Sequence, residues 1–324
     1  MIVQSRRSTT VSVRGRRGFA LIAAIWLMVA LSALGLEVAT LAHTRRLSAA
    51  NAIEAVRARG AADAGIEHAR ARLTRLLTFD TRPDASGSRD PWRRFDLALP
   101  DTIALGDAGY HVELADANAR VNVNLASENQ LRRLFAGLRI DAGVADRLAQ
   151  VIADWRDADD LPHMRGAERS AYLAAGLRTT PRNAPLVRVE ELRDLYGMTP
   201  ALYSSIAPYF TVQGSGQINL NSADRAVLLS LPGVNEEAVA VILKLRANGV
   251  AITNFEQVAA ALPSAARTAF IDATAELLPL VTFETREVEV RSDGWMTGSP
   301  VRVRSSGLFV RGGGAVFVLG RRTG

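Results

Sequence analysis

Five carboxylates in a short segment offer the residue types that hold a divalent cation. They are Asp154, Asp157, Asp159, Asp160 and Glu168. Carboxylates this close together repel one another unless they are solvated or neutralised by a cation. Ca²⁺ suits such oxygen ligands because its flexible coordination accepts loop carboxylates and carbonyls. The spacing is not that of an EF-hand, since the third ligand and its glycine are missing. From the residues alone, a solvated acidic loop and a calcium site both remain open.

The other residue types offer little for catalysis. The chain has no cysteine, which excludes a disulfide framework, a thiol nucleophile, an iron–sulfur cluster and a cysteine-ligated zinc site. The sequence contains no nucleophile elbow, no zinc-protease His pair and no phosphate-cradling glycine loop. The four histidines are scattered along the chain, at His43, His68, His111 and His163. We therefore expect that this protein is not an enzyme.

One segment is similar to the hairpin of helix–hairpin–helix DNA-binding proteins. It runs from Leu231 to Ala238, but Asn235 occupies the place of the glycine that lets a phosphate approach, and two glutamates follow it. Residues 217–250 hold three basic and three acidic groups, and residues 118–160 hold six and seven. Because basic groups dominate affinity for nucleic acids, we expect a packing role for the hairpin and no nucleic-acid partner.

A basic leader precedes an apolar segment long enough to span a membrane. The eighteen residues from Phe19 to Leu36 carry no charge. As a helix they would be about 27 Å long, close to a hydrocarbon core of about 30 Å. Residues 1–18 hold five arginines and no acid, which would keep the leader on the cytoplasmic side. The formal charge of +6 comes from this leader, since residues 19–324 hold 34 basic and 33 acidic groups.

The helical pattern continues beyond the apolar segment. Apolar residues recur at intervals of three and four from Leu47 to Leu77, with arginines between them. This predicts one continuous helix from Phe19 to about Leu77. An ordinary secretory signal cleaved near Ala39 is the alternative, but its apolar region usually has only 7–15 residues.

The junction from Arg16 to Ile22 resembles the type IV prepilin signal, a basic leader ending in Gly18 and followed by Phe19 and an apolar helix. The resemblance implies that a prepilin peptidase cleaves between Gly18 and Phe19, that Phe19 is methylated, and that the helix is retained. Most of that family have Glu as the fifth residue after cleavage, which is thought to pair with the amine of a neighbouring subunit. Here that position is Ala23, which favours a subunit with none ahead of it.

Strands are expected on both sides of a long helical region. Residues 80–94 are rich in Pro, Gly, Ser and Asp, which predicts an exposed linker. Alternating apolar residues predict one strand at about 109–115 and three near the end, over about 283–290, 301–310 and 316–319. Turns are expected at Ser292–Gly294 and Gly312–Gly314. Connections this short imply antiparallel pairing.

The helical region contains an internal echo. Val121–Ala126, with the sequence VNVNLA, is followed 97 residues later by INLNSA at Ile218–Ala223. Apolar helical residues follow both copies. Asn or Ser just before a helix can accept hydrogen bonds from its first free N–H groups. We therefore expect helix-capping roles for Asn122, Asn124, Asn219 and Asn221.

The strand before the helical region and those after it need one another to bury a sheet face, so the helical region is an insertion. The expected fold is α+β, with a pilin-like long N-terminal helix, a small antiparallel sheet and a large all-helical insertion of helix–hairpin–helix or SAM-like type. The expected parts are a cleaved leader at 1–18, a transmembrane segment at 19–36, the amphipathic rest of the helix at 37–79, a linker and first strand at 80–116, the insertion at 117–280 and the last strands at 281–324.

This order of elements resembles the protein K family of minor pseudopilins of type II secretion systems. The junction at Gly18, the missing acid at Ala23, the doubled Asn-x-Asn and the acidic segment carry the likeness together. It implies a non-enzymatic subunit that caps the tip of the secretion pseudopilus and supports protein export across the outer membrane. It further implies an inner-membrane anchor, a periplasmic bulk, and minor pseudopilins I, J and H as partners.

The resemblance also implies structural Ca²⁺ in the helical region, with Asp157, Asp159 and Glu168 as ligands and Asp160 next. Two other functions stay open. One is a membrane-anchored helix–hairpin–helix protein that captures DNA during uptake. The other is a minor pilin of a type IV pilus.

Overall fold

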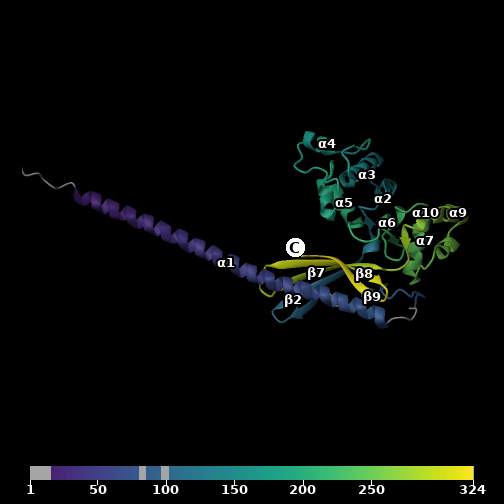
Figure 1. Ribbon diagram of the computed structural model, residues 1–324, viewed down its shortest axis with the longest axis horizontal. Coiled ribbons are helices and arrows are strands. Elements are labelled where there is room, and N and C mark those ends of the chain that lie inside the picture. Colours follow the sequence, from purple (N-terminus) through teal and green to yellow (C-terminus); the bar gives the residue numbers. More distant parts are fainter. Residues whose placement is uncertain (1–15, 80–84, 96–101, 324) are drawn as a thin grey trace, which may run out of the picture. The chain divides into compact units, whose positions relative to one another are not determined.

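The computed structural model describes residues 16–79, 85–95 and 102–323 of the 324-residue chain (Figure 1). The chain divides into two compact units, residues 1–56 and residues 57–324. Most of the leader expected at 1–18 lies outside the described residues, as does the first part of the linker expected at 80–94.

A single long helix, α1, opens the described chain. It runs from Arg16 to Phe79 over 64 residues, so the continuous helix expected from Phe19 to about Leu77 is confirmed. Alanine and leucine, the best helix formers, dominate its sequence, and it contains no proline. Because no residue in it removes a backbone donor, the hydrogen-bond ladder passes from the apolar segment into the amphipathic one without a break.

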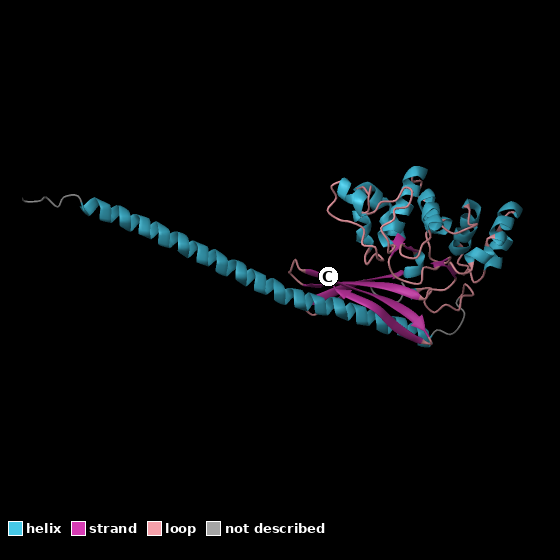
Figure 2. Cartoon of the chain, turned by 45° about the horizontal axis from the view of Figure 1, so that its top comes forward, coloured by secondary structure: helices cyan, strands magenta, loops and turns pink. Residues whose placement is uncertain are grey.

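A five-stranded antiparallel sheet lies in the second unit (Figure 2). The strand order is β1-β2-β7-β8-β9. The strands are β1 (Thr102–Leu105), β2 (Ala108–Asp116), β7 (Glu287–Met296), β8 (Arg302–Gly312) and β9 (Ala315–Thr323). The strand expected at about 109–115 is β2, and β1 is an addition that pairs with it. Pairing of β2 with β7 joins the strand before the helical region to those after it.

One of the two expected turns in this sheet is wrong. No turn occurs at Ser292–Gly294, because β7 continues through these residues to Met296. Gly294 is needed for packing instead, since a Cβ there would overlap the backbone of Ala58 and Ala62 in α1. The turn expected at Gly312–Gly314 is confirmed, because Gly312 pairs with Ala315 across a two-residue hairpin with positive φ at both central glycines.

The last turns of α1 pack on one face of this sheet. Ile66, Ala69 and Leu73 of the helix share a buried apolar cluster with strand residues such as Val290 and Phe309. Gly65 allows this approach, because a Cβ there would overlap the hydroxyl of Ser292.

The Trp92 ring is fully buried in the same cluster, and its indole N–H donates to the carbonyl of Leu73 at 3.1 Å.

The helical region is inserted between two neighbouring strands. It leaves the sheet after Asp116 of β2 and returns before β7, and Asp116 pairs with Val288 of β7. The buried Asp116 carboxylate closes this junction. It accepts hydrogen bonds from the Asn219 amide at 2.7 Å, the Ser222 hydroxyl at 2.6 Å and the backbone N–H of Asn118 at 2.9 Å. Burial raises the pKa of Asp116, which these donors oppose.

The insertion consists of two similar halves, preceded by the 3₁₀ helix η2 (Ala117–Ala119). In each half a two-residue strand pairs in parallel with another that closes the half. The first half contains β3 (Val121–Asn122), α2 (Glu128–Gly137), α3 (Ala142–Arg156), α4 (Arg169–Ala174), η3 (Val189–Asp194), α5 (Pro200–Ile206), η4 (Ala207–Tyr209) and β4 (Phe210–Thr211). The second half contains β5 (Ile218–Asn219), α6 (Arg225–Leu229), α7 (Glu236–Ala247), α8 (Phe255–Ala261), α9 (Ser264–Asp272), α10 (Thr274–Leu277) and β6 (Val281–Thr282).

The repeated asparagines do not cap helices, so that prediction is wrong. Ser127 caps α2 instead, accepting from the backbone N–H of Gln130. Asn124 clamps a distant loop, because its amide accepts from the N–H of Leu186 at 2.8 Å and donates to its C=O at 2.9 Å. Asn221 makes the same pair of bonds to Ile252, at 2.9 and 2.8 Å. Short-range spacing could not reveal this, since the partners are 62 and 31 residues away.

An arginine closes each half in the same way. Arg156, at the end of α3, donates to the carbonyls of Val123 and Ala126. Arg246, in the last turn of α7, donates to the carbonyl of Ala223, the residue 97 positions after Ala126. Burial lowers the pKa of both guanidinium groups. The echo in the sequence therefore reflects a repeated hydrogen-bond framework around a shared apolar core.

Candidate functional site

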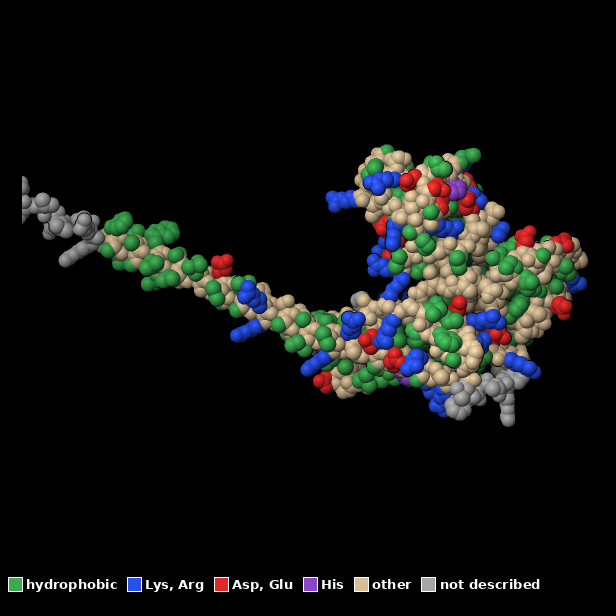
Figure 3. Space-filling view, in the orientation of Figure 1, with side chains coloured by type: hydrophobic (Ala, Val, Ile, Leu, Met, Phe, Trp, Pro, Cys, Tyr) green, Lys and Arg blue, Asp and Glu red, His purple; other side chains and the backbone are tan. Residues whose placement is uncertain are grey.

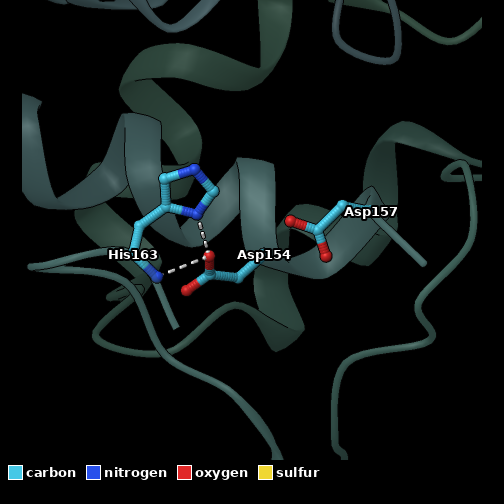
Figure 4. Close-up of side chains that lie close together, drawn as sticks. All are labelled: Asp154, Asp157 and His163. Carbon is cyan, nitrogen blue, oxygen red and sulfur yellow. Dashed lines mark hydrogen bonds and ion pairs between the residues drawn. The ribbon is translucent and has the colours of Figure 1, made fainter. Parts of the chain in front are cut away.

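An acidic cluster lies at the end of α3 in the first half of the insertion. Asp154 comes from the last turn of α3, Asp157 is its C-cap, and His163 comes from the loop that follows. Ligand atoms of these three residues lie within 4.8 Å of one another (Figure 4). Glu168 precedes α4 as its N-cap residue, and the charges of Asp154 and Asp157 act on its carboxylate.

Local packing forces Asp154 inward. Its side chain is fully buried. Gly166 of the following loop lies directly against the carboxylate, and a Cβ at that position would overlap it. The backbone N–H of His163 donates to Asp154 Oδ1 at 3.1 Å, and the imidazole Nδ1 contacts the same oxygen. This bond to Asp154 raises the pKa of His163.

Several carboxylate oxygens of the cluster are buried without a hydrogen-bond donor from the described residues. They are Asp154 Oδ2, Asp157 Oδ1 and both Glu168 oxygens. Burial of Glu168, whose exposed fraction is 2%, raises its pKa to about 7, with further contributions from Asp154, Asp157 and Asp160. Burial and the charges of Asp159 and Asp154 also raise the pKa of Asp157.

These carboxylate oxygens repel one another, and a divalent cation bound between them would relieve that repulsion. An unpartnered buried carboxylate costs free energy, and a cation would remove both the desolvation cost and the repulsion. All four unpartnered atoms are hard carboxylate oxygens, the donors that Ca²⁺ takes in flexible loops. The residues that could hold it are Asp154, Asp157 and Glu168.

The structure separates the five acidic residues into two sets. Asp157 and Glu168, expected as ligands, lie with Asp154 in the buried cluster. Asp159 and Asp160 are exposed. The carboxylate of Asp159 accepts from the N–H of Leu161 at 2.8 Å, and that of Asp160 from the Asn183 amide at 2.9 Å. Sequence spacing does not reveal His163, because only the loop conformation brings it to Asp154.

The apolar segment of α1 forms a second candidate site. The helix from Phe19 to Leu77 is long and apolar enough to cross a membrane, with a mean hydropathy of 2.4 over its most apolar window. The large apolar side chains of its N-terminal part are exposed, with Phe19 at 77%, and they gather on that part of the helix in Figure 3. The expected cleavage junction at Gly18 and Phe19 lies near the start of α1, and Ala23 follows within the helix. The described residues therefore contain one candidate membrane-spanning segment, near the N-terminus.

The hairpin between α6 and α7 packs against other parts of the insertion. Leu231 and Val234 are buried, and a Cβ on Gly233 would overlap Ala273, which follows α9. Asn235 caps α7 by accepting from the N–H of Ala238 at 2.9 Å. The hairpin thus holds α7 against α9, in the packing role that was expected of it.

Comparisons with known proteins agree with this layout. Residues 111–215 match the family model for protein K of the type II secretion system. The type II secretion system protein K of Klebsiella pneumoniae is 30% identical over 145 residues, which is 40% of this chain and 44% of that protein. The protein K of Pseudomonas aeruginosa is 30% identical over 183 residues, 51% of this chain and 55% of that protein. The matches thus cover about half the length of these relatives.

A solved structure is similar over a longer stretch. It is the GspK–GspI–GspJ complex from the type 2 secretion system of enterotoxigenic Escherichia coli. The matched chain has a TM-score of 0.65 and 23% identity, with 87% of this chain and 99% of that chain covered. This likeness confirms the expected α+β, pilin-like fold with a helical insertion. Residues 111–215 thus resemble protein K of the type II secretion system in sequence, and most of the chain resembles a chain of the solved GspK–GspI–GspJ complex in fold.

Proposed function

We propose that this protein is a minor pseudopilin that caps the tip of a type II secretion pseudopilus and supports protein export across the outer membrane. The main support is a pilin-like helix and sheet carrying a two-part helical insertion, a layout similar over 87% of this chain to a chain of the solved GspK–GspI–GspJ complex. The role is mechanical and uses no catalytic residue.

Anchoring depends on α1. Before assembly, Phe19–Leu36 holds the chain in the inner membrane, with residues beyond Glu37 in the periplasm. A prepilin peptidase removes the leader between Gly18 and Phe19 and the new terminus is methylated. The exposed apolar side chains of this segment then pack against the helices of neighbouring subunits.

The tip position follows from what the chain lacks and what it adds. Ala23 provides no carboxylate to pair with the amine of a subunit ahead of it. The insertion of residues 117–280 adds a bulk that would hinder addition of another subunit. Minor pseudopilins I, J and H are the proposed partners, through α1 and the pilin-like sheet. In the similar solved structure, GspK forms a complex with GspI and GspJ, which supports the first two.

Calcium is the proposed ligand of the acidic cluster, in a structural role. Asp154, Asp157 and Glu168 supply the unpartnered oxygens, and Asp159 and Asp160 stand at the exposed rim. A bound cation would join the end of α3 to the start of α4 and so fix the loop between them.

The first test is the N-terminus of the mature protein in membranes of its native cells, with and without the prepilin peptidase. We expect a chain that begins with methylated Phe19 only when the peptidase is present. A Gly18→Asp variant should stay unprocessed and fail to restore secretion in a deletion strain. A chain cut near Ala39, or salt-dependent binding of DNA by residues beyond α1, would favour the DNA-capture alternative instead.

A further inference from the structure

A cleft of about 630 Å³ lies between the sheet and the helical insertion, away from the acidic cluster. The sheet contributes residues of β7, β8 and the end of β9, and the insertion contributes residues before β3, at the start of η3 and after β4. Blue side chains gather beside the hollow between these parts in Figure 3. None of these residues takes part in the calcium site or in α1.

Arginine dominates the charge of this cleft. The lining includes five arginines, Arg120, Arg188, Arg291, Arg304 and Arg322, against the two glutamates Glu190 and Glu289. They come from five separate segments of the chain, so no local basic run in the sequence announces them. Their convergence is a product of the tertiary structure.

Only part of this positive charge is compensated. Glu289 Oε2 lies 3.0 Å from Arg120 and 3.5 Å from Arg291, so one carboxylate serves two guanidinium groups. Arg304 is paired with Asp293 at 2.7 Å. Among the described residues, no carboxylate forms an ion pair with Arg188 or Arg322.

Hydrogen bonds hold the chain segments that line this cleft. Arg322 Nη1 donates to the carbonyl of Val187 at 2.6 Å, which joins the end of β9 to the loop before Arg188. The Thr211 hydroxyl donates to Glu289 Oε1 at 2.6 Å, which fixes the carboxylate that holds Arg120. Both Arg188 and Arg322 are exposed, so their guanidinium groups are accessible.

We propose that this cleft binds an extended acidic segment of a partner protein, with Arg188 and Arg322 as its carboxylate receptors. Guanidinium groups bind carboxylates through paired hydrogen bonds, and clustered arginines recognise acidic motifs. Glu190 and Glu289 interrupt the positive surface, which suits separated carboxylates better than the continuous charge of a nucleic acid. This binding site goes beyond the proposed place in the pseudopilus, because the cleft joins the sheet to the helical insertion, whereas the proposed partner contacts use α1 and the sheet.

The test uses the full chain in detergent micelles and two labelled peptides, Ser-Gly-Glu-Asp-Glu-Asp-Gly-Ser and its amide twin Ser-Gly-Gln-Asn-Gln-Asn-Gly-Ser. Fluorescence anisotropy should show saturable binding of the acidic peptide alone, weakened by salt. The double variant R188E/R322E should weaken binding by about ten-fold or more, and R188Q/R322Q by less, because charge reversal adds repulsion. The control R147E/R178E makes the same charge change on exposed residues of the insertion outside the cleft, and should shift affinity by less than about two-fold.

Thermal melting of each variant checks that the fold is intact. Equal losses in R188E/R322E and R147E/R178E would show that general charge, not the cleft, binds the peptide. Absence of saturable binding would also overturn the proposal. An oligothymidylate that binds the cleft more tightly than the acidic peptide would replace the proposed protein segment with a nucleic acid. None of these results bears on leader processing, so the proposed secretion role is tested separately.

Discussion

The two halves of the insertion share one framework and differ in what their loops carry. In both, an asparagine clamps a loop through its backbone N–H and C=O, and an arginine from a long helix binds the carbonyl at the start of the half. After α3 the first half has Asp157 and a loop that returns to Glu168. After α7 the second half has Asn248 and Gly249, and α8 follows closely.

This difference separates scaffold from site. The clamps use neutral side chains and backbone groups, so they stabilise a half whatever the loops contain. The acidic cluster adds unpartnered charge to one half only, which costs stability unless a cation is bound. The first half should therefore respond to calcium and pH, and the second should not.

The largest expected effect comes from removing a clamp. Asn221→Ala deletes the bonds to Ile252 and one to the carbonyl of Phe283 at 2.7 Å, and Asn124→Ala deletes the two bonds to Leu186. We expect losses of about 3 and about 2 kcal/mol in the free energy of unfolding, measured by urea denaturation. The exposed Asn248→Ala is the control and should change it by less than about 0.5 kcal/mol. Equal effects in all three would remove the clamp interpretation.

Calcium should stabilise the first half alone. At a free concentration of about 100 times Kd it should add about 2.7 kcal/mol, seen as a rise in the melting temperature that a chelator reverses. Asp157→Asn and Glu168→Gln should abolish the rise, because each removes an unpartnered oxygen. Glu237→Gln, a matched change on an exposed acid of the second half, should leave it intact. A rise that survives in Glu168→Gln would place the cation elsewhere.

The chelated protein should depend on pH through Glu168. Its pKa is raised from 4.5 to about 7 in the folded state, so the folded chain binds this proton more tightly than the unfolded chain. Stability should therefore fall as the pH rises from about 4.5 to about 7, and Glu168→Gln should be more stable at pH 8 by about 1–2 kcal/mol. Urea titrations in chelator at pH 5 and pH 8 measure this difference. A Glu168→Gln variant that retains the full pH dependence would assign it to another group.

The smallest effect is expected at the exposed rim. Asp159→Asn keeps an oxygen that can accept from the N–H of Leu161, so stability should change by less than about 0.5 kcal/mol. Calcium affinity, measured by titration calorimetry, should fall less than in Asp157→Asn. A larger fall in Asp159→Asn would show that the loop closes further around the cation and brings this carboxylate in.

Patterns within a few residues of one another determined much of this protein. The uncharged segment and the spacing of apolar residues predicted α1, alternation predicted strands of the sheet, and the 97-residue echo predicted a doubled insertion. The acidic segment was visible for the same reason, since its members are neighbours in the chain. Such patterns can be read from the sequence because they reflect the preferences of residues that are close together in the chain.

Tertiary structure decided which of these residues meet. A turn at Ser292–Gly294 was expected from residue types, but contact with α1 makes Gly294 part of a strand. The asparagines were expected to cap helices, and the packing of distant loops made Asn124 and Asn221 clamps instead. Asp154, rather than Asp159, entered the buried cluster because of the helix face it occupies, and Arg322 met the loop of Val187 from 135 residues away. Such contacts depend on how distant segments pack, which no short window of sequence contains.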